Sequence, residues 1–264
     1  WDDNGVYITT NPNKMGLTLD LTTPEGQELC KQLVERCDVV AENFAPPVLK
    51  GFGLDYESLR QVKPDIIMLS SSGYGHSGPW VNYGSMGVAL EPMTGVCSIT
   101  GYVDGPPMQS AAPYPDIPGA LDGAFAILAA LEYRRRTGKG QWIDLAQYEV
   151  GVSVVGDAVL DYIANGRIQG RMGNRHAYMA PHGVYRCLGN DSWVAIAVSN
   201  DEEWRRLCEV MGQPTLADDE RFSDGFSRWQ HQDELDRIIQ EWTVPQDHYT
   251  VMHRLQEAGV PAGA

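Results

Sequence analysis

The sequence is poor in cysteine and in basic residues. Its five cysteines are scattered and odd in number, and none forms a Cys-x-x-Cys pair. This argues against a disulfide framework or a zinc site and favours the reducing cytoplasm. Lysine and arginine total 20 against 35 aspartates and glutamates, which gives a formal charge of -15. A nucleic-acid binder normally shows a basic stripe, so this balance argues against that class of protein.

Long apolar runs and terminal signals are also missing. No stretch approaches the roughly 18 apolar residues of a membrane-spanning helix, and the six histidines show no metal-ligand spacing. The sequence opens on Trp1 without an initiator methionine or a signal peptide and stops in mid-pattern at Ala264. We therefore expect both ends to be cuts within a longer protein.

The 264 residues, 43% of them hydrophobic, suffice for one large domain or two smaller ones. Short apolar segments alternate with helical patterns in the first part, which predicts a parallel sheet covered by helices. Thr23 and Pro24 open one helix as N-cap and first-turn residue. The expected strands are 16–21, 38–42, 65–70 and 142–146, and the expected helices are 23–36, 56–61, 119–136 and 147–165.

The pattern changes after residue 165. Residues 166–183 lack periodicity and are predicted to form a linker. A hairpin over 184–188 and 193–198 precedes helices at 201–211, 229–242 and 246–258. The predicted fold is α/β, with a Rossmann-like parallel-sheet large domain over 1–165 and a smaller α+β domain over 184–264.

Asp116 lies just before the strongest helical pattern, which places Leu121, Ala124, Phe125, Leu128 and Leu131 on one face. From position alone, a capping carboxylate is the favoured interpretation. The same geometry also suits a nucleophile, because a carboxylate near a helix N-terminus stays ionised. Pro115 and Pro118 would hold it in a stiff loop.

Ligands of parallel sheets bind beyond the carboxyl ends of the strands. Two loops there attract interest, residues 43–47 and residues 70–79. The second contains Ser72-Gly73-Tyr74-Gly75, whose successive N–H groups could bind an anion. An ordinary glycine-rich turn is equally compatible with this pattern. We assign no functional role to His76 from the sequence.

Several segments, each weak alone, share their order and spacing with one family. Together they cover nearly the whole chain. They are Asn11-Pro12-Asn13-Lys14, Leu19-Asp20-Leu21, Thr23-Pro24-Glu25-Gly26, Glu42-Asn43-Phe44, Ser72-Gly73-Tyr74-Gly75, Asp104-Gly105-Pro106-Pro107, Asp116 and Thr137-Gly138-Lys139-Gly140-Gln141. The chain thereby resembles the class III CoA-transferases, the group of formyl-CoA transferase and carnitine CoA-transferase. By this comparison it lacks the family's first strand and its C-terminal return to the large domain.

The resemblance implies that Asp116 is the catalytic nucleophile, which outweighs the capping interpretation. CoA would pass from an acyl-CoA to a free carboxylic acid through an aspartyl mixed anhydride and an aspartyl-CoA thioester. It implies an interlocked homodimer with no permanently bound cofactor, and neither a nucleic-acid nor a membrane partner. It also places residues 173–180 near the active site. The implied CoA contacts are Leu19, Asp20, Leu21, Thr22, Asn43, Phe44, Ala45, Ser72, Gly73, Tyr74 and Gly75.

The sequence departs from the family pattern at several basic positions. Thr22 and Ser72 stand where relatives can carry lysine, and Gly51 stands where they often carry arginine. Lys50, adjacent to Gly51, is a candidate replacement. These departures bear on how the CoA phosphates are held.

Two other functions remain open. A 2-methylacyl-CoA racemase would need a histidine after Gly78-Pro79, and residues 84–88 contain none, so a transferase is favoured. A non-catalytic CoA-binding protein is the other alternative, and Asp116 argues against it. The sequence does not name the acids, although residues 104–108 with Tyr178 and Met179 hint at an apolar acyl site.

Overall fold

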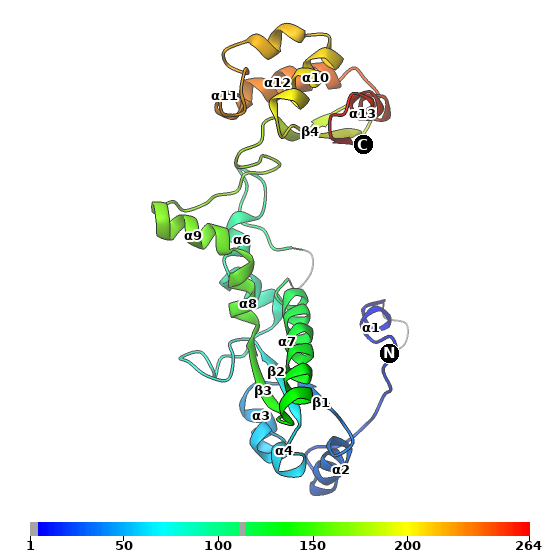
Figure 1. Ribbon diagram of the computed structural model, residues 1–264, viewed down its shortest axis with the longest axis vertical. Coiled ribbons are helices and arrows are strands. Elements are labelled where there is room, and N and C mark those ends of the chain that lie inside the picture. The colour runs from blue at the N-terminus through cyan, green and yellow to red at the C-terminus, as the bar shows by residue number, and fades with distance from the viewer. Residues whose placement is uncertain (1–4, 111–113) are drawn as a thin grey trace. The chain divides into compact units, whose positions relative to one another are not determined.

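A computed structural model describes residues 5–110 and 114–264 of the chain. Its contacts divide the chain into two compact units. Unit 1 comprises Trp1–Thr100 with Pro107–Gln169, and unit 2 comprises Gly101–Pro106 with Gly170–Ala264. Figure 1 traces the elements of each unit.

A parallel three-stranded sheet forms the centre of unit 1. Its strands are β1 (Val39–Glu42), β2 (Ile67–Ser72) and β3 (Gln141–Ala146), in the order β1-β2-β3. Val39 pairs with Ile67, and Ile67 pairs with Gln141. The central strand is buried along nearly its whole length, as expected when helices cover both faces. The α/β class predicted from the sequence is confirmed.

Helices cover the two faces of this sheet. On one face, α2 (Pro24–Val34), α3 (Pro47–Gly51) and α4 (Tyr56–Val62) enclose a core that includes Ile66 and Met68. The predicted N-cap of α2 is confirmed, because the Thr23 side chain accepts a hydrogen bond from Gly26 N at 3.1 Å. On the other face lies α7 (Asp116–Thr137), which packs on β2 and β3 and directly precedes β3 in the chain (Figure 1).

Small residues, rather than large ones, join α7 to the sheet. Gly119, Gly123 and Ala130 are its buried positions, and a Cβ at Gly123 would lie 2.9 Å from Leu69 Cδ2. The apolar face expected from the periodicity turns away from the sheet, because such close approach leaves no room for leucine or phenylalanine. Leu121, Phe125 and Leu128 are between 66% and 74% exposed.

Other segments of unit 1 depart from the sequence expectations. Residues 16–21 form no strand, because no described strand offers them a ladder partner, and Leu17 is exposed. The single helix expected over 147–165 is two helices, α8 (Gln147–Val154) and α9 (Gly156–Asn165), which meet at Val155. Four described helices of unit 1 were not anticipated, namely α1 (Gly5–Thr10), α3, α5 (Gly87–Met93) and α6 (Val96–Ile99).

Unit 2 packs helices on an antiparallel sheet. Its strands β4 (His182–Arg186), β5 (Trp193–Ala197) and β6 (Ala262–Gly263) are ordered β4-β5-β6, which confirms the predicted hairpin. The helical elements are α10 (Asp201–Met211), η1 (Pro214–Asp218), α11 (Gly225–Gln230), α12 (Gln232–Thr243) and α13 (His248–Glu257). The segment expected as one helix over 229–242 is divided between α11 and α12, which are separated at His231.

A buried arginine lies within the core of unit 2. Arg228 is 1% exposed, and its guanidinium donates to Ala180 O at 2.9 Å and to Phe222 O at 3.1 Å. It also pairs with Asp201 Oδ1 at 2.8 Å and lies over the Trp204 ring. One side chain therefore links three segments of this core.

The five cysteines are free. Among the described residues, no helix is long and apolar enough to cross a membrane. The same part of the chain contains no group of three or more histidine, cysteine, aspartate or glutamate side chains placed to hold a metal ion.

Candidate active site

The carboxyl edge of the parallel sheet brings together three segments that are distant in sequence. Glu42 pairs with Ser70, and Ser72 pairs with Ala146, so residues 43–45, residues 73–75 and Gln147 leave the sheet at the same edge. Helix α7 begins at this edge (Figure 1). This is where parallel sheets bind their ligands.

Asp116 is the first residue of α7, and the N-cap position before it belongs to Pro115. The Asp116 side chain is half-buried, and the first turn of α7 packs near Gln147, the first residue of α8, since a Cβ at Gly119 would lie 3.6 Å from Gln147 Cγ. Burial raises the pKa of Asp116, and the Gln147 amide partly opposes that rise. Asp116 is therefore a first-turn residue of α7 and not its N-cap.

The glycine-rich loop joins the same group of residues. Tyr148 N donates to Gly73 O at 2.9 Å, which ties the loop to the first turn of α8 beside Gln147. A Cβ at Gly73 would overlap the Ser85 side chain, and Gly75 has a φ of 80°, so both glycines are required by local geometry. The glycine-rich loop and the first turn of α7 therefore both pack against the start of α8.

His76, to which the sequence assigned no role, connects the ends of all three strands. Its backbone N–H lies 3.0 Å from both carboxylate oxygens of Asp144, and its Nδ1 lies 3.1 Å from Asp144 Oδ1. Its Nε2 lies 4.0 Å from Glu42 Oε1, while Phe44 N donates to Glu42 Oε2 at 2.7 Å. These contacts fix residues 43–45 and the glycine-rich loop relative to each other.

Aromatic rings surround the loop. The Tyr74 ring packs edge-on against Trp80 at 5.5 Å and Tyr83 at 6.3 Å, and lies 5.7 Å from Tyr148. Trp80 and Tyr83 are partly exposed. The edge therefore offers an apolar surface beside the polar groups of the loop.

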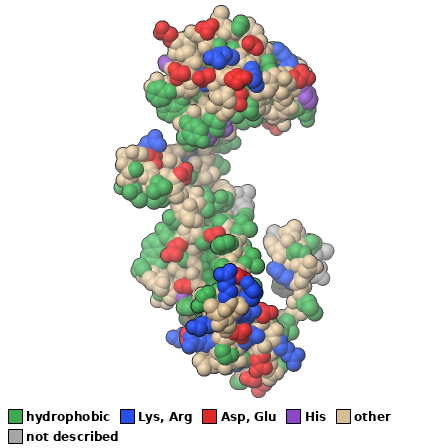
Figure 2. Space-filling model, in the orientation of Figure 1, with side chains coloured by type: hydrophobic (Ala, Val, Ile, Leu, Met, Phe, Trp, Pro, Cys, Tyr) green, Lys and Arg blue, Asp and Glu red, His purple; other side chains and the backbone are tan. Residues whose placement is uncertain are grey.

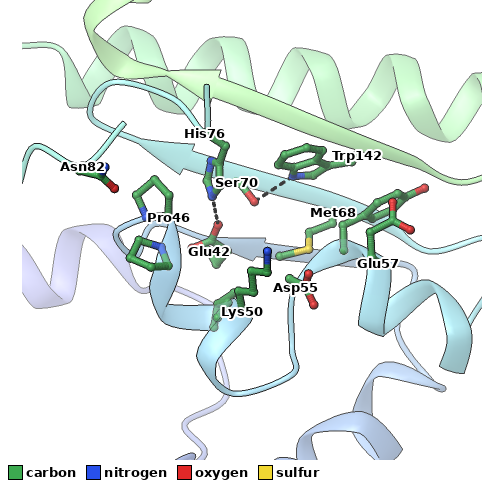
Figure 3. Close-up of a pocket in the computed structure, with 13 residues that line it drawn as sticks. Glu42, Pro46, Lys50, Asp55, Glu57, Met68, Ser70, His76, Asn82 and Trp142 are labelled. Atoms are coloured by element: carbon green, nitrogen blue, oxygen red, sulfur yellow. Dashed lines mark hydrogen bonds and ion pairs between the residues drawn. The ribbon is translucent and has the colours of Figure 1, made fainter. Parts of the chain in front are cut away.

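A cavity of about 350 Å³ is lined by residues of α3, α4 and the sheet, among them Glu42, Pro46 and Trp142 (Figure 3). Met68 and Trp142 form apolar walls, and Trp142 Nε1 donates to Ser70 Oγ at 3.1 Å. The Lys50 ammonium points into this space (Figure 3). Lys50 thus lines this cavity together with Glu42 and Pro46, the residues on either side of 43–45.

Residues 19–22 are held by local contacts at the start of α2. Asp20 Oδ1 accepts hydrogen bonds from Thr22 N at 3.0 Å and Thr22 Oγ1 at 2.6 Å, and these bonds lower the pKa of Asp20. Leu21 packs partly against the α2–α4 core. The side-chain hydrogen bonds of residues 20–22 among the described residues stay within this segment and the first turns of α2.

Gly26 should be essential to the shape of this segment. A Cβ at Gly26 would overlap the backbone carbonyl of Asp20, which cannot yield as a flexible side chain does. We expect Gly26→Ala to lower the free energy of unfolding by about 1–3 kcal/mol, as overpacked sites do. Urea denaturation followed by circular dichroism measures this. Gly156→Ala is the control, because its Cβ would meet no atom within 4 Å, and equal stability of the two variants would contradict the argument.

The sequence profile of CoA-transferase family III matches residues 2–264. This chain belongs to CoA-transferase family III. It is 38% identical over 251 residues to succinyl-CoA–D-citramalate CoA-transferase of Chloroflexus aurantiacus, covering 95% of this chain and 62% of that protein. It is 37% identical over 257 residues to succinate–glutarate CoA-transferase of Agrobacterium fabrum, covering 97% of this chain and 64% of the relative.

A solved structure of a related protein has the same fold as this family III chain. The crystal structure of a CAIB/BAIF family protein from Brucella suis matches with a TM-score of 0.86 and 35% identity. The match covers 96% of this chain and 67% of that one. The family resemblance predicted from the sequence motifs is confirmed.

Within this family III chain, the sequence motifs located most of the carboxyl edge but not all of it. Residues 43–45 and 72–75 and Asp116 come together there. Gln147 and the His76–Asp144 pair were missed. Gln147 could have been found, because it directly follows the predicted strand 142–146, at the end of the strand where parallel sheets bind ligands.

Proposed function

We propose that this protein is a CoA-transferase that moves CoA from an acyl-CoA to a free carboxylic acid, with Asp116 as the nucleophile. The observation that carries the proposal is the half-buried Asp116 carboxylate, which lies in the first turn of α7 at the carboxyl edge of the sheet, where the glycine-rich loop also lies. A carboxylate in the first turn of a helix is stabilised by the helix dipole, and carboxylates serve as covalent nucleophiles. The names of the relatives support the same activity.

In the proposed mechanism, an Asp116 oxygen attacks the thioester carbonyl of the donor, and the carbon–sulfur bond breaks to give a mixed anhydride and CoA thiolate. The thiolate attacks the Asp116 carbonyl carbon and expels the donor acid as its carboxylate, which leaves an aspartyl-CoA thioester. The acceptor carboxylate then displaces the thiolate to form a second anhydride. Attack of the thiolate on the acceptor carbonyl releases the new acyl-CoA and regenerates the Asp116 carboxylate.

We propose that CoA lies along the carboxyl edge, in contact with residues 43–45 and 72–75, with residues 19–22 at its far end. The protein carries a formal charge of -15, so the CoA phosphates need a local cation. Lys50 is suitably placed, because it belongs to α3, which directly follows residues 43–45. The five free cysteines favour the reducing cytoplasm as the location.

We infer further that unit 1 corresponds to the CoA-binding large domain and that the protein acts as a homodimer. The exposed apolar face of α7, formed by Leu121, Phe125 and Leu128, supports association with a second copy, since such patches mark interaction sites. Light scattering of the purified protein measures the oligomeric state, and a monomer would contradict this part.

The reaction is tested by incubating the purified protein with succinyl-CoA and a set of free dicarboxylic acids. We expect new acyl-CoA species by mass spectrometry, with the α-hydrogens of the acyl group retained in deuterated water. A racemase would exchange α-hydrogen without moving CoA, and a CoA-binding scaffold would do neither. The engagement of His76 by Asp144 and the lack of histidine at 84–88 favour the transferase.

A further inference from the structure

Two carboxylates each hold the start of a loop at the carboxyl edge of the sheet. The Glu42 carboxylate, at the end of β1, accepts a hydrogen bond from Phe44 N at 2.7 Å. The Asp144 carboxylate, on β3, accepts from the backbone N–H of His76, with 3.0 Å to each of its oxygens. Strand pairing does not reach residues 43–45 or His76, so these side-chain bonds hold the start of each loop.

The imidazole of His76 joins the two carboxylates. Glu42 and Asp144 stand level with each other, because both pair with Ser70 of the strand between them. The Nδ1 atom of His76 lies 3.1 Å from Asp144 Oδ1, and its Nε2 lies 4.0 Å from Glu42 Oε1 (Figure 3). The ring also packs edge-on against Trp142, with 5.4 Å between the ring centroids. It therefore spans the central strand and links the loop after β1 to the loop after β2.

This link is largely shielded from water. The His76 side chain is 15% exposed, and that of Glu42 is 6% exposed. A carboxylate only accepts hydrogen bonds, so Nδ1 carries a proton in the contact with Asp144. When Nε2 is protonated as well, the ring forms an ion pair with Glu42, and partly buried pairs are screened less than exposed ones. The spacing between the two loops thus depends on the imidazole.

We propose that His76 is a positioning residue for CoA binding, which sets the distance between residues 43–45 and residues 72–75 by bridging Glu42 and Asp144. This inference rests on the proposed function, in which both segments contact CoA, and it gives His76 no contact with the reacting atoms. A ligand that touches both loops binds more tightly when they are already held, because less ordering is left to occur on binding. The same CoA contacts persist through the reaction, so the link should strengthen binding of substrate and transition state equally.

The decisive variant is His76→Phe, which removes both ring nitrogens but keeps an aromatic ring beside Trp142 and the backbone N–H to Asp144. We expect KM for succinyl-CoA to rise about 10-fold with kcat within about two-fold of wild type, since uniform binding is what is lost. The Kd of CoA, measured by isothermal titration calorimetry, should rise by the same factor. A side chain that served the fold alone would instead lower the melting temperature and leave KM and Kd unchanged.

Two further substitutions test the bridge itself. Glu42→Gln keeps an acceptor for Phe44 N but removes the charge that faces His76, and it should raise the Kd of CoA by a smaller factor. When it is combined with His76→Phe, the loss of affinity should be smaller than the sum of the two single losses, because residues that share one interaction are not additive. His76→Asn, whose amide can still donate to Asp144, should recover part of the affinity lost in His76→Phe. Additive losses would contradict the bridge.

His253→Phe is the matched control, since His253 is exposed on α13 in unit 2 and its loss should change neither KM nor Kd. Wild-type KM and Kd in folded His76→Phe would overturn the inference, as would a fall in kcat with KM unchanged. Should His76→Phe fail to fold, wild-type Kd values in both Glu42→Gln and His76→Asn would overturn it. In each of these cases wild-type protein still binds and transfers CoA, so only the role of His76 fails. Wild-type protein that neither binds nor transfers CoA would instead refute the proposed function itself.

Discussion

Asp116→Ala should lower the rate of CoA exchange by roughly four orders of magnitude or more, the scale seen when a covalent nucleophile is removed. Without this carboxylate, neither of the two proposed covalent intermediates, the mixed anhydride and the aspartyl-CoA thioester, can form. Half-buried Asp116 contacts Gln147 but is part of neither hydrophobic core, so the fold should survive its loss. The measurement is CoA exchange between succinyl-CoA and a free acid, with circular dichroism as the check on folding.

The matched control is Asp122→Ala, which removes an exposed carboxylate from the same helix and should retain full activity. Hydroxylamine added during turnover should trap the activated carboxyl group as a hydroxamate, located by peptide mass spectrometry at Asp116. A hydroxamate on another residue, or undiminished exchange in Asp116→Ala, would assign the nucleophile elsewhere.

The largest expected loss of stability follows from Arg228→Ala. Removal of the guanidinium leaves two buried carbonyl oxygens, those of Ala180 and Phe222, without their donor. It also removes the side chain that packs over Trp204. Buried acceptors without partners are costly, and breaking a buried ionic network costs more, so we expect a loss of about 3–5 kcal/mol. Urea unfolding followed by tryptophan fluorescence measures it.

Arg205→Ala provides the comparison, because Arg205 is exposed on α10 and its loss should change stability by less than about 0.5 kcal/mol. Arg228→Lys should recover only part of the loss, since a single ammonium cannot reproduce the fork of the guanidinium. Equal stability of the Arg205 and Arg228 variants would show that the buried network contributes nothing.

The sequence predicted the sheet and its carboxyl edge because their signals are local. Three of the four short apolar strands, the Thr23 cap and the turn that follows the strand at 67–72 each depend on a few adjacent residues, and each was found close to where it was expected. The position of Asp116 before a helix was equally visible. Its contact with Gln147 was not, because it joins residues 31 positions apart whose proximity depends on α7 packing across the sheet.

The wrong predictions also arose where the structure depends on packing between segments that are distant in sequence. Periodicity located an apolar stripe on α7 but could not tell that glycines, not leucines, face the sheet. Residues 16–21 have the composition of a strand, but strand formation also requires a neighbouring strand. Helices α8 and α9 are separated at Val155, a residue type that does not mark a helix end. Gly156 follows it, but a single glycine within a helical pattern does not by itself predict a break.

The glycine-lined contact of α7 also sets how far Asp116, the proposed nucleophile, stands from the strands. Any side chain at Gly123 would press on Leu69 and push the helix away from the sheet. Such a displacement would tilt the helix and move its first turn, and the Asp116 carboxylate with it, relative to α8. A single methyl group placed two turns along the helix would thus be enough to change where the Asp116 carboxylate points.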